Sequence, residues 1–141
     1  MDADTIELAS SLRQVVLRLT RRLRAQRADM SVSVTQLMAL ATLVKHGPMS
    51  AGELAGHERV QPPSMTKILA ALEEHGLAQR RQDPSDRRQI IVQATEAGAT
   101  LLVQERMKRD AWLSTRLVSL TAEERRLLHK VAPLLQRLAE E

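Results

Sequence analysis

The sequence predicts a mainly α-helical fold of six helices with one small β-hairpin. Apolar residues recur at helical spacing over most of the chain, and turn-forming residues separate these segments. Two short apolar runs near the middle flank a polar turn, as the strands of a hairpin do. At 141 residues, the chain is long enough for one domain or for one protomer of a dimer.

The first two helices are expected from Asp4 to about Arg27 and over Val34–His46. In the first, leucine and valine side chains fall on one continuous face, and most of the arginines lie elsewhere on its surface. Those arginines could contact phosphates, but an ordinary solvated face is the favoured interpretation. The second helix is expected to end at Gly47-Pro48, because proline cannot continue a helix.

Two more helices follow in close succession. Ser50 and Glu53 have the spacing of a capping box and open a short helix, and Gly56 is expected in the connection toward the next helix. That next helix begins at Gln61-Pro62-Pro63-Ser64 and ends at His75-Gly76, where glycine favours a left-handed cap. Its apolar residues recur at i, i+3, i+4 and i+7, which predicts one buried stripe: Met65, Ile68, Leu69 and Leu72.

The other residues at the start of this helix are expected to face outward, where they suit the major groove of DNA. Serine and threonine hydroxyls bond to bases or phosphates, and a lysine reaches guanine or the backbone. The helix dipole adds favourable charge for a phosphate. The candidate DNA-binding residues of this helix are Gln61, Pro62, Pro63, Ser64, Thr66 and Lys67.

A hairpin is expected from strands Leu77–Arg81 and Ile90–Ala94, joined by a turn-forming Asp-Pro-Ser-Asp segment. Arg87 and Arg88 then lie at its tip. One arginine there can enter a minor groove, while the other holds a phosphate or pairs with Asp86. A solvated turn that only keeps the hairpin soluble is the alternative. Because the hairpin follows a candidate recognition helix, the order favours a winged helix-turn-helix, with Asp86, Arg87 and Arg88 as DNA-binding candidates.

The last two helices are expected from Thr95 to about Leu117 and from Thr121 to about Ala139, the latter opened by a capping box with Glu124. The expected helices and hairpin divide the chain into three parts. These are dimerisation helices at 1–32 and 117–141, a winged helix-turn-helix lobe at 33–95, and a long connecting helix at 96–116 that also joins the dimer region.

The terminal helices are too apolar for a winged domain that stands alone in water. Their apolar faces imply burial against each other and against a second copy of the chain. A twofold dimer would present two recognition helices to major grooves roughly 34–36 Å apart, which predicts a pseudo-palindromic operator. The candidate dimerisation residues are Leu8, Leu12, Val16, Leu19, Leu128, Val131, Leu135 and Leu138.

Taken together, these segments resemble the MarR family of dimeric bacterial transcription regulators. The matching segments are QPPSMTKILAALEEHGL for the recognition helix, RRQDPSDRRQIIVQAT for the wing, and TEAG and LTAEE opening the last two helices. Asp86, Arg88 and Val92 fall on the family's Asp-x-Arg-x-x-x-Val pattern. The resemblance covers essentially the whole chain. It implies a homodimeric repressor of its own or a nearby operon, relieved by a small aromatic or anionic effector.

Three residues are candidates for binding that effector. Met30 and Met38 lie near the junction between the first helix and the winged lobe, although core packing is the interpretation that their spacing favours. Trp112 is the only aromatic residue of the chain, and a role as a core or dimer-interface anchor is the alternative for it.

Composition narrows the function classes further. A net charge of +4 and a pI near 10.3 are compatible with nucleic acid. Without cysteine the chain can neither sense oxidants through a thiol nor build a thiolate zinc ribbon. No segment approaches the roughly 18 apolar residues of a membrane span, so we expect a cytoplasmic protein.

Catalysis and metal binding are not expected. The sequence contains no glycine-rich phosphate loop, nucleophile elbow or clustered carboxylate pair, and it implies no cofactor. Its histidines lack the spacing of a ligand pair. A winged-helix module that binds a protein instead of specific DNA is the remaining alternative. The polar and basic residues Ser64, Thr66, Lys67, Arg87 and Arg88 argue against it.

Overall fold

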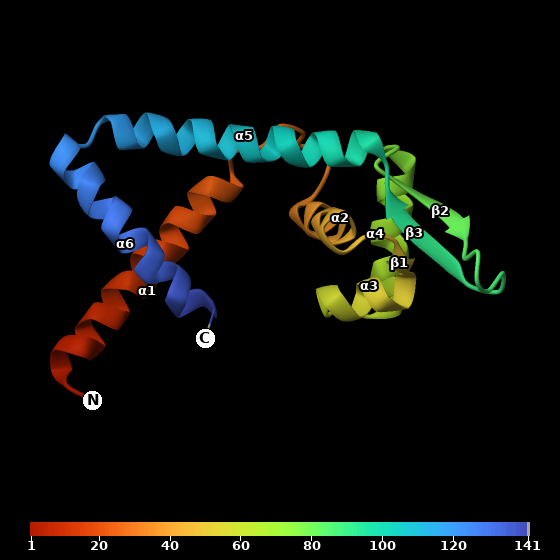
Figure 1. Ribbon diagram of the computed structural model, residues 1–141, viewed down its shortest axis with the longest axis horizontal. Coiled ribbons are helices and arrows are strands. Elements are labelled where there is room, and N and C mark those ends of the chain that lie inside the picture. The colour runs from red at the N-terminus through yellow and green to blue at the C-terminus, as the bar shows by residue number, and fades with distance from the viewer. Residues whose placement is uncertain (141) are drawn as a thin grey trace. The chain divides into compact units, whose positions relative to one another are not determined.

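The computed structural model describes residues 1–140, in which six helices accompany a small antiparallel sheet (Figure 1). This confirms the predicted fold class. The elements are α1 (Ala3–Arg24), α2 (Val34–His46), β1 (Met49–Ser50), α3 (Ala51–Glu58), α4 (Pro62–Glu74), β2 (Ala78–Gln82), β3 (Ile90–Ala94), α5 (Glu96–Val118) and α6 (Ala122–Glu140).

The chain forms two compact units. We call Arg24–Lys108 the winged lobe, and we call Met1–Leu23 together with the chain from Arg109 onward the terminal unit. These boundaries differ from those expected, because residues 24–32 group with the winged lobe and the division falls inside α5. The reason is local: Val32 is fully buried in the lobe's core, and Arg27 pairs there with Glu105 of α5.

One apolar core holds the winged lobe together. Leu40 of α2, Leu54 of α3, Leu69 and Leu72 of α4, and Val92 of β3 are all almost completely removed from solvent. The apolar stripe of α4 is buried as the sequence predicts. Burying one such side chain contributes about 1.5–3 kcal/mol, so the stripe fixes the rotation of α4 about its own axis.

The sheet has the order β1-β3-β2, with every neighbouring pair antiparallel. Strands β2 and β3 form the expected hairpin, with Arg80 opposite Val92, and β2 begins one residue later than expected. Strand β1 was not predicted; it pairs Met49 with Val92 on the other edge of β3. A strand of two residues has no periodicity to detect, and only the tertiary fold brings it beside β3.

Helix boundaries follow the predicted caps with two corrections. The Ser50–Glu53 capping box forms as expected, but Gly56 lies inside α3 rather than in a connection. The helix continues because its backbone hydrogen bonds extend beyond Ala55, and one internal glycine costs only about 1 kcal/mol. The first helix ends at Arg24, before the expected Arg27, because Arg27 leaves the helical path to donate a hydrogen bond to the Val32 carbonyl.

The start of α5 packs very closely against the connection between α4 and β2. The Thr95 N–H donates to Leu77 O at 3.0 Å, and the Thr95 hydroxyl donates to Gly76 O at 2.6 Å. Gly98 lies one turn further on, where a Cβ atom would stand 2.3 Å from Leu77 O and 2.9 Å from Leu40 Cδ1. The backbone of Leu77 cannot move away easily, so position 98 requires glycine.

Replacing Gly98 by alanine should therefore lower the free energy of unfolding by about 1–3 kcal/mol through overpacking. Chemical denaturation followed by circular dichroism measures the change. The matched control is Gly56→Ala, since nothing lies within 4 Å of its added Cβ and alanine favours the helix by about 0.5–1 kcal/mol. Equal stability of Gly98→Ala and the unaltered chain would contradict the close packing of α5.

Candidate nucleic-acid interface

The exposed face of α4 consists of the residues opposite its buried stripe. All six residues predicted for DNA binding on this helix are exposed. Pro63, Thr66 and Lys67 share one face through their i, i+3 and i+4 spacing. Ala70 continues the same face one turn later and is also exposed. Ala70 was not among the predicted residues because alanine bears no polar group, although its spacing of four residues from Thr66 places it on the same helix face.

The donors at the start of α4 are mostly side-chain groups. Pro62 and Pro63 occupy the first helical positions and have no backbone N–H to offer a phosphate. The attraction of the helix end for anions is therefore smaller than the helix dipole alone implies. The Ser64 hydroxyl and the Lys67 ammonium have no hydrogen-bond or ion-pair partner within residues 1–140, so both can bind an external group.

The hairpin tip is held in one shape by its own backbone and side chains. The Asp83 N–H donates to Gln89 O at 2.9 Å, and the Gln89 N–H donates to Asp86 O at 3.0 Å. The Asp83 carboxylate accepts the Ser85 hydroxyl at 2.7 Å and the Ser85 N–H at 2.9 Å. The bond from the Ser85 hydroxyl, followed by the bond from the Ser85 N–H, lowers the pKa of Asp83, so its carboxylate stays ionised to a more acidic pH than an ordinary aspartate.

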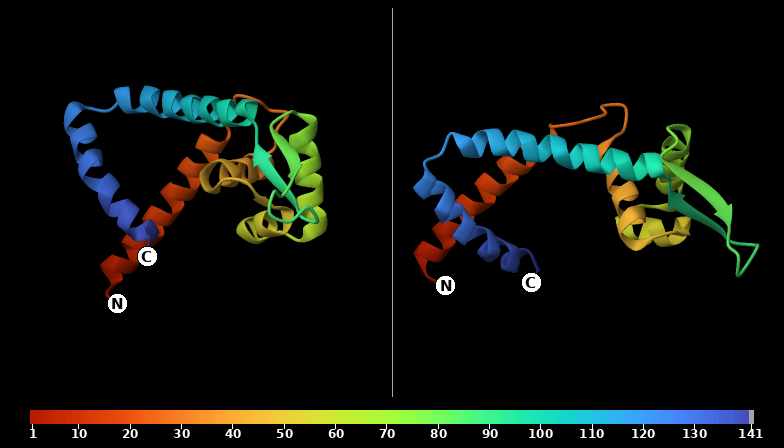
Figure 2. Two further views of the ribbon diagram at one scale, coloured as in Figure 1. Left: turned by 45° about the vertical axis from the view of Figure 1, so that its right-hand side comes forward. Right: turned by 45° about the horizontal axis from the view of Figure 1, so that its top comes forward.

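Asp86 positions one of the two tip arginines. Its Oδ1 accepts the Arg88 N–H at 3.0 Å and lies 3.4 Å from Arg88 Nε. The Arg88 side chain is nonetheless 93% exposed. Arg87 beside it is exposed and forms no ion pair with another described residue. The ribbon views show this tip extending beyond α2, α3 and α4 of the same lobe (Figures 1 and 2).

Other arginines of the lobe divide into structural and exposed ones. Arg80 pairs with Glu73, and Arg81 donates to Gln93 Oε1 at 2.9 Å, so both fasten β2 to its neighbours. Arg59 is exposed at the junction of α3 and α4, in the left-handed conformation with φ of 54°. Arg59 was not among the residues predicted for DNA binding. Its only signal was a basic residue just before the candidate recognition helix.

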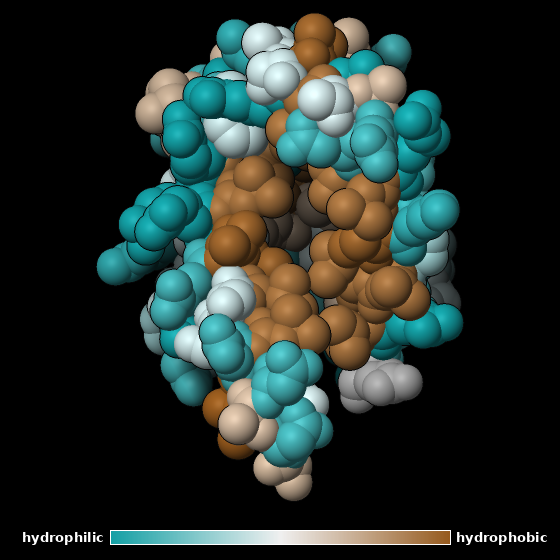
Figure 3. Space-filling model, turned by 90° about the vertical axis from the view of Figure 1, so that its left-hand side faces the viewer, coloured by the Kyte–Doolittle hydropathy of each residue, from teal (hydrophilic) through white to brown (hydrophobic). Residues whose placement is uncertain are grey.

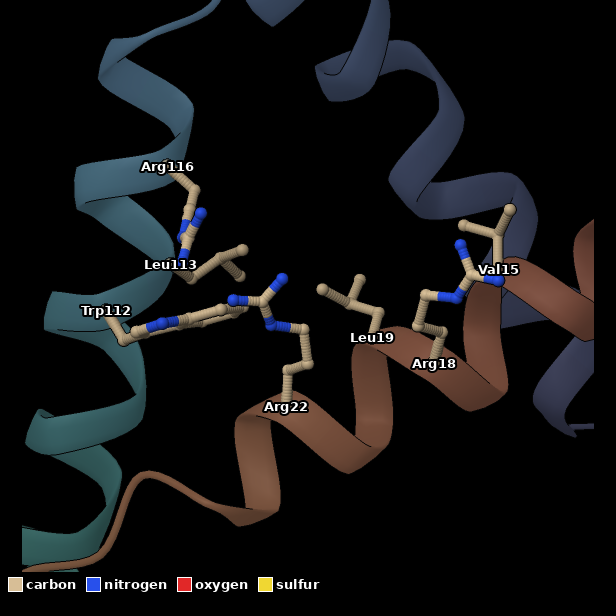
Figure 4. Close-up of a pocket in the computed structure, with 7 residues that line it drawn as sticks. All are labelled: Val15, Arg18, Leu19, Arg22, Trp112, Leu113 and Arg116. Atoms are coloured by element: carbon tan, nitrogen blue, oxygen red, sulfur yellow. The ribbon is translucent and has the colours of Figure 1, made fainter.

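A pocket of about 270 Å³ lies in the terminal unit between α1 and α5. Leu19 and Leu113 point into it, and Trp112 forms one wall (Figure 4). The guanidinium carbons of Arg22 and Arg116 lie 5.5 Å and 4.9 Å from the centre of the Trp112 ring, within cation–π range. The complete lining is Val15, Arg18, Leu19, Arg22, Trp112, Leu113 and Arg116.

The two methionines considered for an effector are not part of this pocket. Met30 is 78% exposed and Met38 is 53% exposed. The interpretation of both as core residues is therefore wrong, because Leu37, Leu40 and Leu43 provide the buried side of α2 instead. Of the three effector candidates, only Trp112 lines the pocket between α1 and α5.

The terminal unit differs from the winged lobe in having no apolar core on α1 or α6. No residue of either helix is buried within the protomer. In the space-filling view of this side, apolar side chains gather around a hollow with polar side chains at its rim (Figure 3). The residues predicted for dimerisation are exposed or half-buried: Leu8, Leu12, Val16, Leu19, Leu128, Val131, Leu135 and Leu138.

Metal-ligating side chains do not cluster in the described part of the chain. No group of three or more histidine, aspartate or glutamate residues in residues 1–140 could hold an ion. His46 and His57 stack with their ring centroids 4.8 Å apart, a pairing that the sequence did not indicate. None of the described helices is long and apolar enough to cross a membrane.

Comparison with known proteins agrees with this geometry. The profile of the MarR family matches residues 32–90. The HTH-type transcriptional regulator Mb0904 of Mycobacterium bovis is 43% identical over 141 residues, which is 100% of this chain and 98% of that protein. The chain belongs to the MarR family. As such it is a DNA-binding transcriptional regulator with a winged helix-turn-helix.

Other MarR relatives extend the comparison. The HTH-type transcriptional repressor NicR of Pseudomonas putida is 35% identical over 98 residues, covering 70% of this chain and 62% of NicR. A crystal structure from Pseudomonas aeruginosa PA01, of a protein proposed to be a transcriptional regulator, superposes with a TM-score of 0.88 at 34% identity and covers 100% of this chain and 99% of that one. A MarR family protein from Bacillus stearothermophilus has the same fold, with a TM-score of 0.79 at 23% identity over 100% of this chain and 99% of that one.

Proposed function

We propose that this MarR protein acts in the cytoplasm as a homodimer that binds a pseudo-palindromic operator and represses its own or a nearby operon. A small anionic aromatic effector releases it from the DNA. The observation that supports this proposal best lies in the winged lobe, where one well-packed core leaves the face of α4 and the arginines of the wing tip exposed together.

The exposed face of α4 has the properties that major-groove binding requires. The short side chains of Pro63 and Ala70 allow DNA to approach the helix closely. Lys67 supplies positive charge for a phosphate or a guanine. At the wing tip, the Asp86 carboxylate accepts the backbone N–H of Arg88, so the backbone that carries this arginine is ordered before DNA arrives. Arginine inserted in a narrow minor groove meets concentrated negative potential.

A second copy of the chain is the occupant that best fits the apolar faces of the terminal unit. Leu127, Leu134 and Leu138 of α6 and Val15 of α1 are each 48–66% exposed, which is costly for a protein alone in water. A twofold axis would pair identical faces and bury both sets at once. It would also give two winged lobes, as a pseudo-palindromic operator requires.

Repression is supported by relatives. NicR of Pseudomonas putida and MdtR of Bacillus subtilis are both named as repressors. A repressor that occupies an operator needs no catalytic group, only DNA affinity and a means of release.

The pocket between α1 and α5 suits an anionic aromatic effector. Arg18, Arg22 and Arg116 line it and no carboxylate is among the lining residues, so the pocket offers charge-assisted contacts to an anion. The Trp112 ring and the adjoining leucines favour a flat apolar body. Such a ligand would alter the packing of α1 on α5 and thereby favour one arrangement of the dimer over another.

Specific DNA binding is tested with the DNA immediately upstream of the protein's own coding region, with random duplex as competitor at two salt concentrations. We expect binding that resists the competitor and weakens as salt rises, because each neutralised phosphate adds about −0.9 to the log–log slope. Arg88→Ala should weaken binding by about five- to 100-fold and flatten the slope. The control Arg126→Ala removes an exposed arginine of α6 and should bind normally.

An affinity of Arg88→Ala equal to that of the unaltered protein would remove the wing from the proposed interface. If neither the upstream DNA nor fragments selected from the whole genome bind better than random duplex, the protein-interaction module becomes the better account.

Replacing Leu135 by aspartate should dissociate the dimer, because an unpaired charge would be buried at the proposed interface. Sedimentation velocity measures the state of association, and thermal denaturation reports whether the protomer remains folded. The matched control Arg126→Asp places the same charge on the opposite side of α6 and should leave the dimer intact. A fully dimeric, folded Leu135→Asp variant would contradict this placement of the interface.

The single tryptophan makes the pocket directly observable. Benzoate should change the fluorescence of Trp112 saturably and weaken operator binding, whereas benzamidine, with the same ring and a positive charge, should do neither. Arg116→Gln should weaken the benzoate response at least fivefold through loss of a charge-assisted contact. The control is Arg13→Gln on α1, which does not line the pocket. Equal responses to benzoate and benzamidine would exclude an anion-selective site.

A further inference from the structure

Two hydroxyl side chains at the start of α4 differ in what they can offer to DNA. The Thr66 hydroxyl donates its hydrogen to Pro62 O at 3.1 Å. No such bond occupies Ser64 within the described chain. Ser64 can therefore donate or accept, but Thr66 presents only lone pairs and a methyl group to an external partner.

The bond made by Thr66 also occurs at other helical threonines of the chain. Thr115 on α5 makes the same bond to the carbonyl four residues earlier at 2.9 Å, and the Thr42 hydroxyl on α2 lies 3.2 Å from Met38 O as well as 3.0 Å from Glu58 Oε1. A β-branched side chain has few allowed rotamers in a helix, and this bond selects one of them. The bond to Pro62 O thus favours one orientation of the Thr66 hydroxyl before any DNA binds.

The surroundings of Thr66 on the exposed face are apolar. Pro63 lies one turn before it and Ala70 one turn after it, and both are exposed. Neither residue bears a side-chain hydrogen-bonding group. Lys67 is the nearest cation in sequence. A base edge that meets this face encounters a small apolar surface with one acceptor oxygen at its centre.

In the major groove, an acceptor oxygen beside a methyl group is disfavoured opposite guanine and favoured opposite an A·T pair. Guanine presents only acceptors at N7 and O6, which a group without a free donor cannot satisfy. An A·T pair presents the amino group of adenine, which can donate to the threonine oxygen, and the methyl group of thymine, which packs against the threonine methyl. Cytosine also has an amino donor, but it lacks the methyl group.

We propose that Thr66 is a specificity-determining residue that selects an A·T base pair in each half-site by packing its methyl group on the thymine methyl. This proposal rests on the proposed operator binding by α4. It also separates the roles of neighbouring residues, because Lys67 supplies affinity for phosphate or guanine and Thr66 rejects guanine at its own position.

The test removes one methyl group at a time from each side of the contact. An operator is first selected from random duplexes by the full-length protein. Each thymine of a half-site is then replaced in turn by deoxyuridine, which lacks only the methyl group. We expect one position at which the replacement lowers affinity about fourfold per half-site, the effect of about one buried methyl group. Thr66→Ser removes the protein's methyl and should be insensitive to deoxyuridine at that position.

Two further variants assign the effect to the methyl group rather than to the hydroxyl. Thr66→Val keeps a methyl and loses the hydroxyl, so it should retain the sensitivity to deoxyuridine. The control Ser64→Ala should also retain it. All three substitutions are at exposed positions, and thermal denaturation verifies that each variant is folded.

The possible outcomes separate the two proposals. If a sequence is selected but Thr66→Ser keeps the full deoxyuridine effect, or no thymine position responds, the role of Thr66 is overturned while operator binding stands. Loss of the effect in Thr66→Val would likewise overturn the methyl contact. If the protein selects no sequence at all, operator binding fails and the role of Thr66 fails with it.

Discussion

Burial of the apolar stripe on α4 is the constraint on which the rest of the winged lobe depends. Met65, Ile68, Leu69 and Leu72 each contribute about 1.5–3 kcal/mol by leaving water, and they can do so together only in one rotation of the helix. That rotation leaves Pro63, Thr66 and Lys67 exposed, and none of them bonds to another described helix or strand of the lobe. The interface is thus oriented by the core behind it rather than by the residues that form it.

A buried ion pair adds a second constraint at the edge of the same lobe. Glu105 of α5 is 1% exposed and accepts the Asp29 N–H at 3.1 Å, while Arg27 Nε lies 3.6 Å from Glu105 Oε2. Arg27 also donates to the carbonyls of Asp29 and Val32. These bonds fasten the connection between α1 and α2 to α5. Removing one partner would leave the other charge buried and uncompensated, which is far more costly than an exposed pair.

The two units of the chain differ in how much apolar surface they leave exposed to solvent. The winged lobe buries most of its leucines in one internal core, and the wing tip that it exposes is polar and basic. The terminal unit leaves apolar faces of α1 and α6 open to solvent within the protomer. A division of this kind favours association through the terminal unit and DNA binding by the winged lobe, since each surface presents the chemistry that its partner needs.

The sequence by itself determined the elements and their order, because helical periodicity, capping boxes and turn residues are local signals that act within a few residues. It therefore predicted the stripe of α4, the hairpin and the exposure of Arg88. Only the tertiary structure decided features that depend on segments distant in the chain. These include the pairing of β1 with β3, the Arg27–Glu105 ion pair and the meeting of Trp112 with Arg22. It also decided that Met38 lies in solvent, since apolar spacing on a helix cannot tell which side of it the core will cover.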